Sequence, residues 1–174
     1  TPDFEHYFFI DGGALGVENA LKAAFDWKYQ LTKNPDMDVI HFKEAFHGRS
    51  GYTMSMTNNG GPDEENIKVK WYPKFKWTRV TNPKIHFPID EIKVQNLESM
   101  AIQEMIEALE KGNVAAIIIE PIQGEGGDNQ FRQEFFVKLR ELADKYQAML
   151  IFDEVQTGVG LTGKMWCYEH YGVI

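Results

Sequence analysis

The spacing of hydrophobic and polar residues predicts a chain that alternates between strands and helices. Four short apolar runs, at residues 7–10, 38–42, 114–119 and 148–152, have the length and composition of buried strands. The run at 114–119 contains no polar side chain, which is typical of a strand covered on both faces of a sheet.

Between these runs, apolar residues return at every third or fourth position, the spacing of an amphipathic helix. One set predicts a helix over about 14–31, and two others predict helical faces along 97–109 and 131–146. Gly112 is the expected C-cap of the second helix. The first set contains Val17, Leu21, Ala24, Trp27 and Leu31; the second contains Leu97, Ala101, Met105 and Leu109; the third contains Phe131, Phe135, Leu139, Leu142 and Tyr146.

This order predicts an α/β fold with a mostly parallel sheet and helices on both faces, because the crossovers are long enough for parallel pairing. Ligands of such sheets bind at the carboxyl ends of the strands. Short segments that interrupt the apolar pattern follow the predicted strands, at Gly12-Gly13, Phe46-His47, Glu120-Pro121 and Asp153-Glu154. We therefore expect these four places to meet.

Residues 57–90 form a long irregular loop in this scheme, of the kind that is usually functional or covers another surface. Its 68–84 segment interleaves basic and aromatic residues without any acid, a pattern found in single-stranded nucleic-acid platforms. The alternative is an exposed loop whose aromatic rings pack on its own protein. We favour that alternative because the whole chain is acidic.

Composition narrows the classes of protein. The chain has 174 residues, 43% of them hydrophobic, which can support a packed core. Its net charge of −8 argues against a polyanion-binding protein. A single cysteine fits a reducing compartment and predicts a cytoplasmic protein. No apolar run is long enough to cross a membrane. Neither end resembles a natural terminus, so we expect a fragment.

Single motifs leave the chemistry open. Gly12-Gly13-Ala14, between a strand and a helix, can bind a phosphate on backbone N–H groups, but it is not the GxGxxG of dinucleotide sites. Asp153, at a strand end, can be a cap or an ion-pair partner, or it can hold a proton on a heteroaromatic nitrogen. The five histidines lack metal-ligand spacing, so no metal site is expected.

Four motifs taken together resemble the class III (subgroup II) aminotransferases, which use pyridoxal 5′-phosphate. They are FIDGGALGVENALK at 9–22, AFHGR at 45–49, EPIQGEGG at 120–127 and FDEVQTG at 152–158. The resemblance implies part of the large cofactor-binding domain of fold type I, spanning residues 1–174. It also implies that the N-terminal segment, the catalytic-lysine region and the small C-terminal domain are missing.

The same resemblance implies cofactor-binding residues. Gly13 and Ala14 would offer backbone N–H groups to the cofactor phosphate. Phe46 would stack on the pyridine ring, with His47 beside it. Asp153 would bond the protonated ring nitrogen and keep the ring cationic, which makes it an electron sink.

Four further roles follow from the resemblance. Gln156 would contact the ring-hydroxyl side of the cofactor and the substrate, and Arg49 would clamp a substrate carboxylate. Glu120 would support the site, and Glu125 resembles an acidic switch that masks a second arginine. The resemblance also implies that the catalytic lysine is absent from this chain, because Lys164 follows Asp153 too soon.

Within the family, the motifs most resemble the lysine 6-aminotransferase subgroup. This implies ping-pong transfer of the ε-amino group of L-lysine to 2-oxoglutarate, giving 2-aminoadipate 6-semialdehyde and glutamate. The parent would be a homodimer, without nucleic-acid or membrane partners, and the fragment alone would be inactive. Ornithine, acetylornithine and 4-aminobutyrate aminotransferases remain alternatives, as does a non-catalytic nucleic-acid-binding module.

Overall fold

A computed structural model describes residues 4–58 and 67–173 of the chain. Its helices are α1 (Gly13–Thr32), α2 (Glu91–Leu109) and α3 (Gln133–Tyr146), with short 3-10 turns η1 (Thr53–Ser55) and η2 (Cys167–His170). Its strands are β1 (Asp38–Phe42), β2 (Arg79–Val80), β3 (Val114–Ile119) and β4 (Met149–Phe152).

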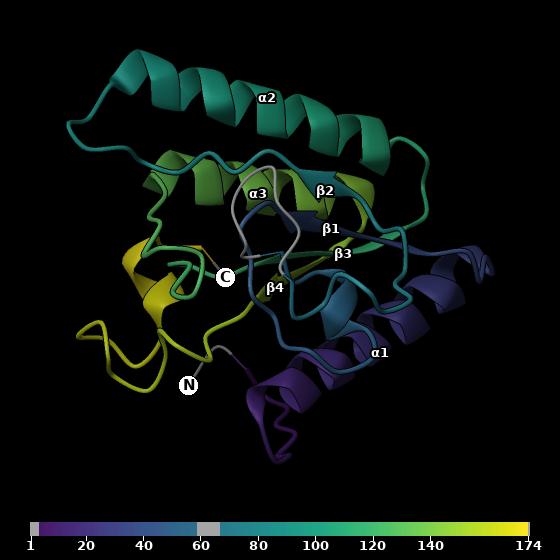
Figure 1. The fold of residues 1–174 in the computed structure, drawn as a ribbon. Coiled ribbons are helices and arrows are strands. Elements are labelled where there is room, and N and C mark those ends of the chain that lie inside the picture. The colour runs from purple at the N-terminus through teal and green to yellow at the C-terminus, as the bar shows by residue number, and fades with distance from the viewer. Residues whose placement is uncertain (1–3, 59–66, 174) are drawn as a thin grey trace.

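The four strands form one sheet in the order β2-β1-β3-β4, and every pair is parallel (Figure 1). All six residues of β3 are buried, as the apolar run predicted. The parallel α/β fold is thereby confirmed, and the C-terminal ends of β1, β3 and β4 point to the same edge of the sheet.

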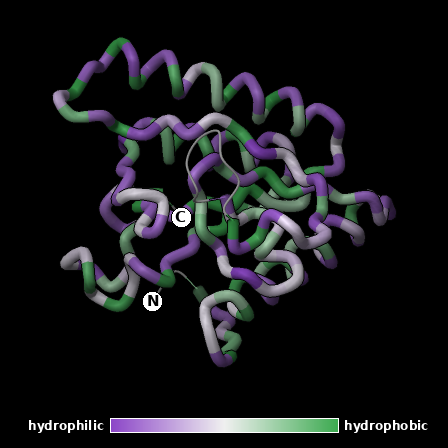
Figure 2. The backbone as a smooth tube through the Cα atoms, viewed as in Figure 1, coloured by the Kyte–Doolittle hydropathy of each residue, from purple (hydrophilic) through white to green (hydrophobic). Residues whose placement is uncertain are grey.

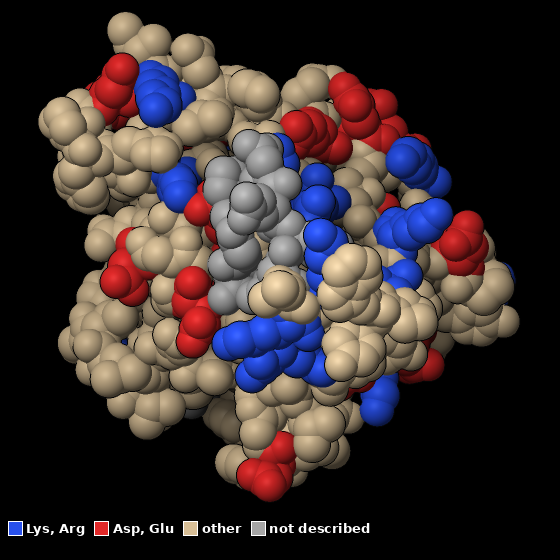
Figure 3. Space-filling model, viewed as in Figure 1, with Lys and Arg blue, Asp and Glu red and all other residues tan. Residues whose placement is uncertain are grey.

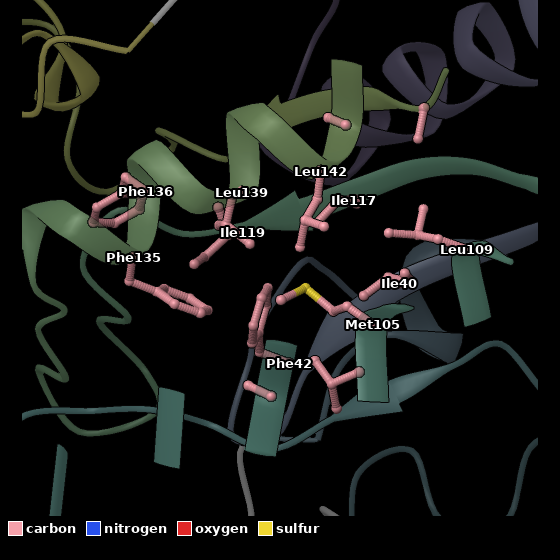
Figure 4. Packing of buried hydrophobic residues seen from close by; sticks show 14 of the residues in the cluster. Ile40, Phe42, Met105, Leu109, Ile117, Ile119, Phe135, Phe136, Leu139 and Leu142 are labelled. Carbon is pink, nitrogen blue, oxygen red and sulfur yellow. The ribbon is translucent and has the colours of Figure 1, made fainter. Parts of the chain in front are cut away.

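Helices α2 and α3 cover one face of the sheet. The core on this side joins Ile40 and Phe42 of β1 and Ile117 of β3 to residues of both helices (Figure 4). The ring of Phe42 meets that of Phe135 edge to face, with centroids 5.8 Å apart. This face holds the larger of the two apolar clusters, which fixes α3 above β3 and β4.

Helix α1 and the η1 turn cover the opposite face. Val17, Leu21 and Ala24 of α1 pack on β1 and β3 as predicted, whereas Leu31, the last residue of the predicted stripe, is 50% exposed. Hydrophobic residues therefore concentrate along the sheet, whereas the outward side of the helices is more polar (Figure 2). The sheet is covered on both faces, as expected.

Three predictions about local structure need correction. Residues 7–10 are not a strand: Phe8 is 71% and Phe9 91% exposed, and they pair with none of the described strands, although Tyr7 and Phe8 line a pocket with β4. The C-cap of α2 is Glu110, while Gly112 adopts a left-handed conformation two residues later. The described part of the 57–90 loop contains β2, whose two residues pair with β1 and were too few to show a periodicity.

Candidate active site

A pocket opens where the C-terminal ends of β1, β3 and β4 meet the start of α1. It is lined by Gly13, Ala14, Phe46, His47, Gly48, Glu120, Asp153, Val155 and Gln156. All four segments that follow the predicted strands contribute residues to this pocket. Seven of the nine lining residues are predicted site residues; Gly48 and Val155 were missed, although each directly neighbours a motif residue that was singled out.

A buried ion pair in this pocket joins His47 and Asp153. His47 Nδ1 lies 2.7 Å from Asp153 Oδ2, and the two side chains are 0% and 4% exposed. Burial lowers the pKa of His47, but the hydrogen bond and the charge of Asp153 outweigh it, so the pKa is raised overall. His47 Nε2 is buried without a partner among the described residues. Asp153 is thus held by a histidine that shares its proton.

Glu120 ties two sides of the pocket together. Its Oε1 accepts a hydrogen bond of 2.8 Å from the backbone N–H of Phe46. Burial raises the pKa of the Glu120 carboxyl to about 7, while His47 and the Phe46 N–H oppose the rise. The carboxyl therefore exchanges its proton near neutral pH, within the same pocket as Asp153.

The start of α1 is suited to an anion. Its N-cap, Gly12, has no side chain to cap the helix, and the first turn carries no acid. The first backbone N–H groups of a helix lack internal acceptors and sit at the positive end of its dipole. Gly13 and Ala14 bring them to the pocket wall. A Cβ on Gly13 would lie 2.7 Å from a Val155 methyl, so glycine allows the two segments to approach.

Two predicted site residues do not line this pocket. Arg49 is exposed, with its guanidinium 5.9 Å from the centroid of the Phe46 ring, so it sits beside the pocket. Glu125 is exposed in the loop that follows Glu120. Lys164 is also outside the pocket: its Nζ donates to the backbone oxygen of Glu169 at 2.7 Å.

The basic aromatic segment packs part of its aromatic side chains on its own protein. Phe75 and Trp77 stack at 4.9 Å, and both rings contact Tyr52. Trp71 remains 78% exposed, with Lys70 Nζ 5.0 Å from its ring centroid. Lys and Arg side chains gather near the middle of the face shown in Figure 3. The alternative of a self-packing loop thus holds for Phe75 and Trp77.

The described residues hold no group of three or more His, Cys, Asp or Glu side chains arranged for a metal ion. None of the described helices is both long and apolar enough to cross a bilayer.

The family follows from comparison with known proteins. Residues 1–174 match the class-III aminotransferase family over their whole length, and the chain belongs to that family. It is 47% identical to the L-lysine-epsilon aminotransferase of Mycobacterium tuberculosis, over 99% of this chain and 39% of that protein. It is 33% identical to the human mitochondrial 4-aminobutyrate aminotransferase, over 92% of this chain and 37% of that protein.

The solved structures agree. The fold superimposes on lysine aminotransferase from M. tuberculosis with a TM-score of 0.91 and 46% identity, covering 100% of this chain and 41% of that one. The chain therefore spans about two fifths of the length of these relatives. The parallel sheet and the pocket at its edge belong to a class-III aminotransferase domain.

Proposed function

We propose that the complete polypeptide is a pyridoxal-phosphate-dependent aminotransferase that moves the ε-amino group of L-lysine to 2-oxoglutarate. The observation that carries the proposal is the buried His47–Asp153 pair, in one pocket with Phe46 and the uncapped start of α1. The similarity to L-lysine-epsilon aminotransferases supports the choice of lysine. We propose further that residues 1–174 are part of its large cofactor-binding domain.

The pocket residues fit the cofactor by their chemistry. The free N–H groups at Gly13 and Ala14 suit a phosphate dianion, and Phe46 offers an aromatic face at the rim. Asp153 offers a carboxylate with its second partner already fixed. When bound, pyridoxal phosphate supplies an electron sink for the carbon that loses its proton.

The chain's own residues would then hold charges and protons in place. Asp153 would accept a hydrogen bond from the protonated pyridine nitrogen, and His47 would keep the carboxylate oriented. Gln156 would contact the ring-hydroxyl side with its amide. Glu120 would hold the Phe46 backbone so that the ring stays over the cofactor.

Substrate residues are proposed beside the pocket. Lysine reacting through its ε-amino group leaves its α-carboxylate several ångströms from the cofactor. Arg49, next to the Phe46 ring, is our candidate for the clamp on that carboxylate, because a guanidinium binds a carboxylate with two parallel hydrogen bonds. Glu125, exposed on its loop, is our candidate for the acidic switch. Neither role needs the side chain inside the pocket.

A second candidate is 4-aminobutyrate aminotransferase activity, because relatives with that name also match most of the chain. The two donors differ at the α-carbon. Lysine carries an α-amino group beside its carboxylate, whereas 4-aminobutyrate does not.

The test is a donor profile of the complete polypeptide that contains this chain. We expect 2-oxoglutarate to become glutamate at least tenfold faster, in kcat/KM, with L-lysine than with ornithine, acetylornithine or 4-aminobutyrate. Detection of an aldehyde product from lysine would locate the transfer at the ε-carbon. A preference for another donor would contradict the lysine assignment and leave the family unchanged.

We also propose that the complete polypeptide is a cytoplasmic homodimer, on the strength of the family resemblance and the single cysteine. Light scattering of the purified polypeptide tests the oligomer, and a monomer would contradict it.

A further inference from the structure

The loop that follows β3 lies between two other segments of the pocket. One is the turn after β1, which carries Phe46, and the other is the segment after β4, which carries Val155 and Gln156. The loop itself supplies Glu120, whose carboxylate accepts from the Phe46 N–H. The structure of this loop therefore bears on how the two segments are placed.

The side chain of Gln123 forms the central hydrogen bonds of the loop. Gln123 is fully buried, and its Nε2 donates to the backbone oxygen of Lys43 at 3.0 Å. Its Oε1 accepts hydrogen bonds of 2.8 Å from both Asn82 and Asn129. The main chains of Gln123 and Asn129 also exchange two hydrogen bonds of 3.0 Å. One amide thus joins the end of β1, the end of β2 and its own loop.

The buried carboxylate of Glu44 completes this network. Glu44 is 5% exposed; it accepts from Asn82 and forms an ion pair with Lys84. Buried polar groups of this kind are costly without partners. In this network Asn82 Oδ1 has no partner among the described residues, while both polar atoms of the Gln123 amide are paired. The network therefore specifies one arrangement of the loop.

Two glycines allow the loop to lie in close contact with the neighbouring segments. A Cβ on Gly126 would lie 2.2 Å from the backbone oxygen of Glu44, in the turn before Phe46. A Cβ on Gly124 would lie 2.0 Å from Gln156 Oε1. A side chain on Gly126 would clash with backbone, and one on Gly124 would displace the Gln156 amide, so the loop touches both segments directly.

We propose that Gln123 is a positioning residue that sets the separation of the Phe46 segment and the Gln156 segment. It acts through Lys43 on one side and through Gly124 on the other, and it touches no cofactor itself. This inference rests on the proposed function, because the separation matters for the cofactor that the pocket would bind.

The first test uses pyridoxamine 5′-phosphate, which binds without a covalent bond to a lysine. In the complete polypeptide, Gln123→Met keeps the length of the side chain but removes its hydrogen bonds. We expect its affinity for pyridoxamine 5′-phosphate to fall at least tenfold, with a changed circular dichroism of the bound cofactor. The measurement is made well below the melting temperature, so that unfolding does not contribute.

The matched control is Gln103→Met, on the exposed side of α2, where the amide donates a hydrogen bond to Glu107 at 3.0 Å. It should bind within twofold of the wild type. The circular dichroism band reports the tilt of the cofactor in its asymmetric pocket, which a general loss of stability does not change.

A second variant tests the contact between the loop and the Gln156 segment, whether or not Gln123→Met folds. Gly124→Ala leaves the Gln123 network intact and displaces only the flexible amide of Gln156. It should weaken binding of pyridoxamine 5′-phosphate at least fivefold in the wild-type background. In a Gln156→Ala background the same change should have no effect, because nothing remains to be displaced.

The outcomes separate the two proposals. If the wild type binds pyridoxamine 5′-phosphate and Gln123→Met binds it equally well with the same spectrum, Gln123 does not position the pocket and the proposed function stands. Equal losses from Gly124→Ala in both backgrounds would exclude the route through Gln156. If the wild type does not bind, the proposed function fails and this inference fails with it.

Discussion

His47 and Asp153 are 106 positions apart in sequence, yet their side chains meet at 2.7 Å inside the protein. His47 follows β1 by five residues, and Asp153 directly follows β4. Their contact crosses the end of β3, which lies between the two strands. The pair is therefore a product of sheet order, and it places one carboxylate at the centre of the candidate site.

Replacing this carboxylate should remove most of the activity. Asp153→Asn keeps the shape of the side chain, but an amide cannot hold the charge of a protonated pyridine nitrogen. We expect kcat/KM for the donor to fall at least 100-fold, about 2.7 kcal/mol of transition-state stabilisation. Steady-state kinetics on the complete polypeptide measures this. Turnover close to that of the wild type would remove Asp153 from the mechanism.

The contribution of Glu120 to stability should fall as pH rises, whereas the buried His41, whose pKa burial lowers to about 3, acts in the opposite sense below pH 6.5. The pKa of Glu120 is about 7 in the folded protein against an ordinary 4.5, so the folded state binds more protons between these values. The carboxyl therefore favours folding below pH 4.5 and loses that contribution as pH rises to about 7. His47, whose pKa is also raised, favours folding below 6.5 and loses its contribution above that pH.

Glu120→Gln is the matched variant, because the amide oxygen can still accept from Phe46. Between pH 4.5 and 7, its free energy of unfolding should decline less than that of the wild type, by about 2–3 kcal/mol. Denaturant titrations at several pH values would show the difference. Parallel pH profiles would mean that Glu120 does not titrate in this range.

Arg49 should affect donors according to their carboxylates. Arg49→Ala removes the guanidinium beside Phe46, and we expect KM for L-lysine to rise at least tenfold. A simple alkylamine without a carboxylate is the internal control and should change less than twofold. Equal losses for both donors would show that Arg49 supports the Phe46 ring instead of clamping the substrate.

Lys28 should stabilise the fold by donating hydrogen bonds to backbone oxygens at the C-terminal end of α3. Although it lies in α1 and is only 3% exposed, its Nζ donates to the backbone oxygens of Tyr146 and Gln147 at 3.3 and 2.7 Å. Lys28→Met leaves both carbonyls without this donor and removes a positive charge from the helix C-terminus. We expect a loss of about 1–3 kcal/mol in the free energy of unfolding.

The control for this prediction is Lys22→Met, on the exposed side of the same helix. Its effect should stay within about 0.5 kcal/mol. Chemical denaturation of the three proteins provides the comparison, and equal stabilities would mean that water replaces Lys28 at the end of α3.

Local pattern alone determined most of the secondary structure. The bounds of β1 and β3 agree with the predicted runs, and α1 differs from its prediction by one residue at each end. These segments bury a continuous stripe or face, so their hydrophobic spacing carries the information. The motif residues could be selected in the same way, because polar groups at strand ends gather at one edge of a parallel sheet.

Contacts between distant segments decided the rest. Residues 7–10 have the composition of a strand, but a strand needs a paired neighbour for its backbone hydrogen bonds, and these residues pair with none of the described strands. The partners of Gln123 lie in three separate segments, and no local pattern marks its amide as buried. The sequence by itself determined which residues could do chemistry. The order of the strands decided which of them share a proton, because hydrogen bonds and charges act over a few ångströms of space, whatever their separation along the chain.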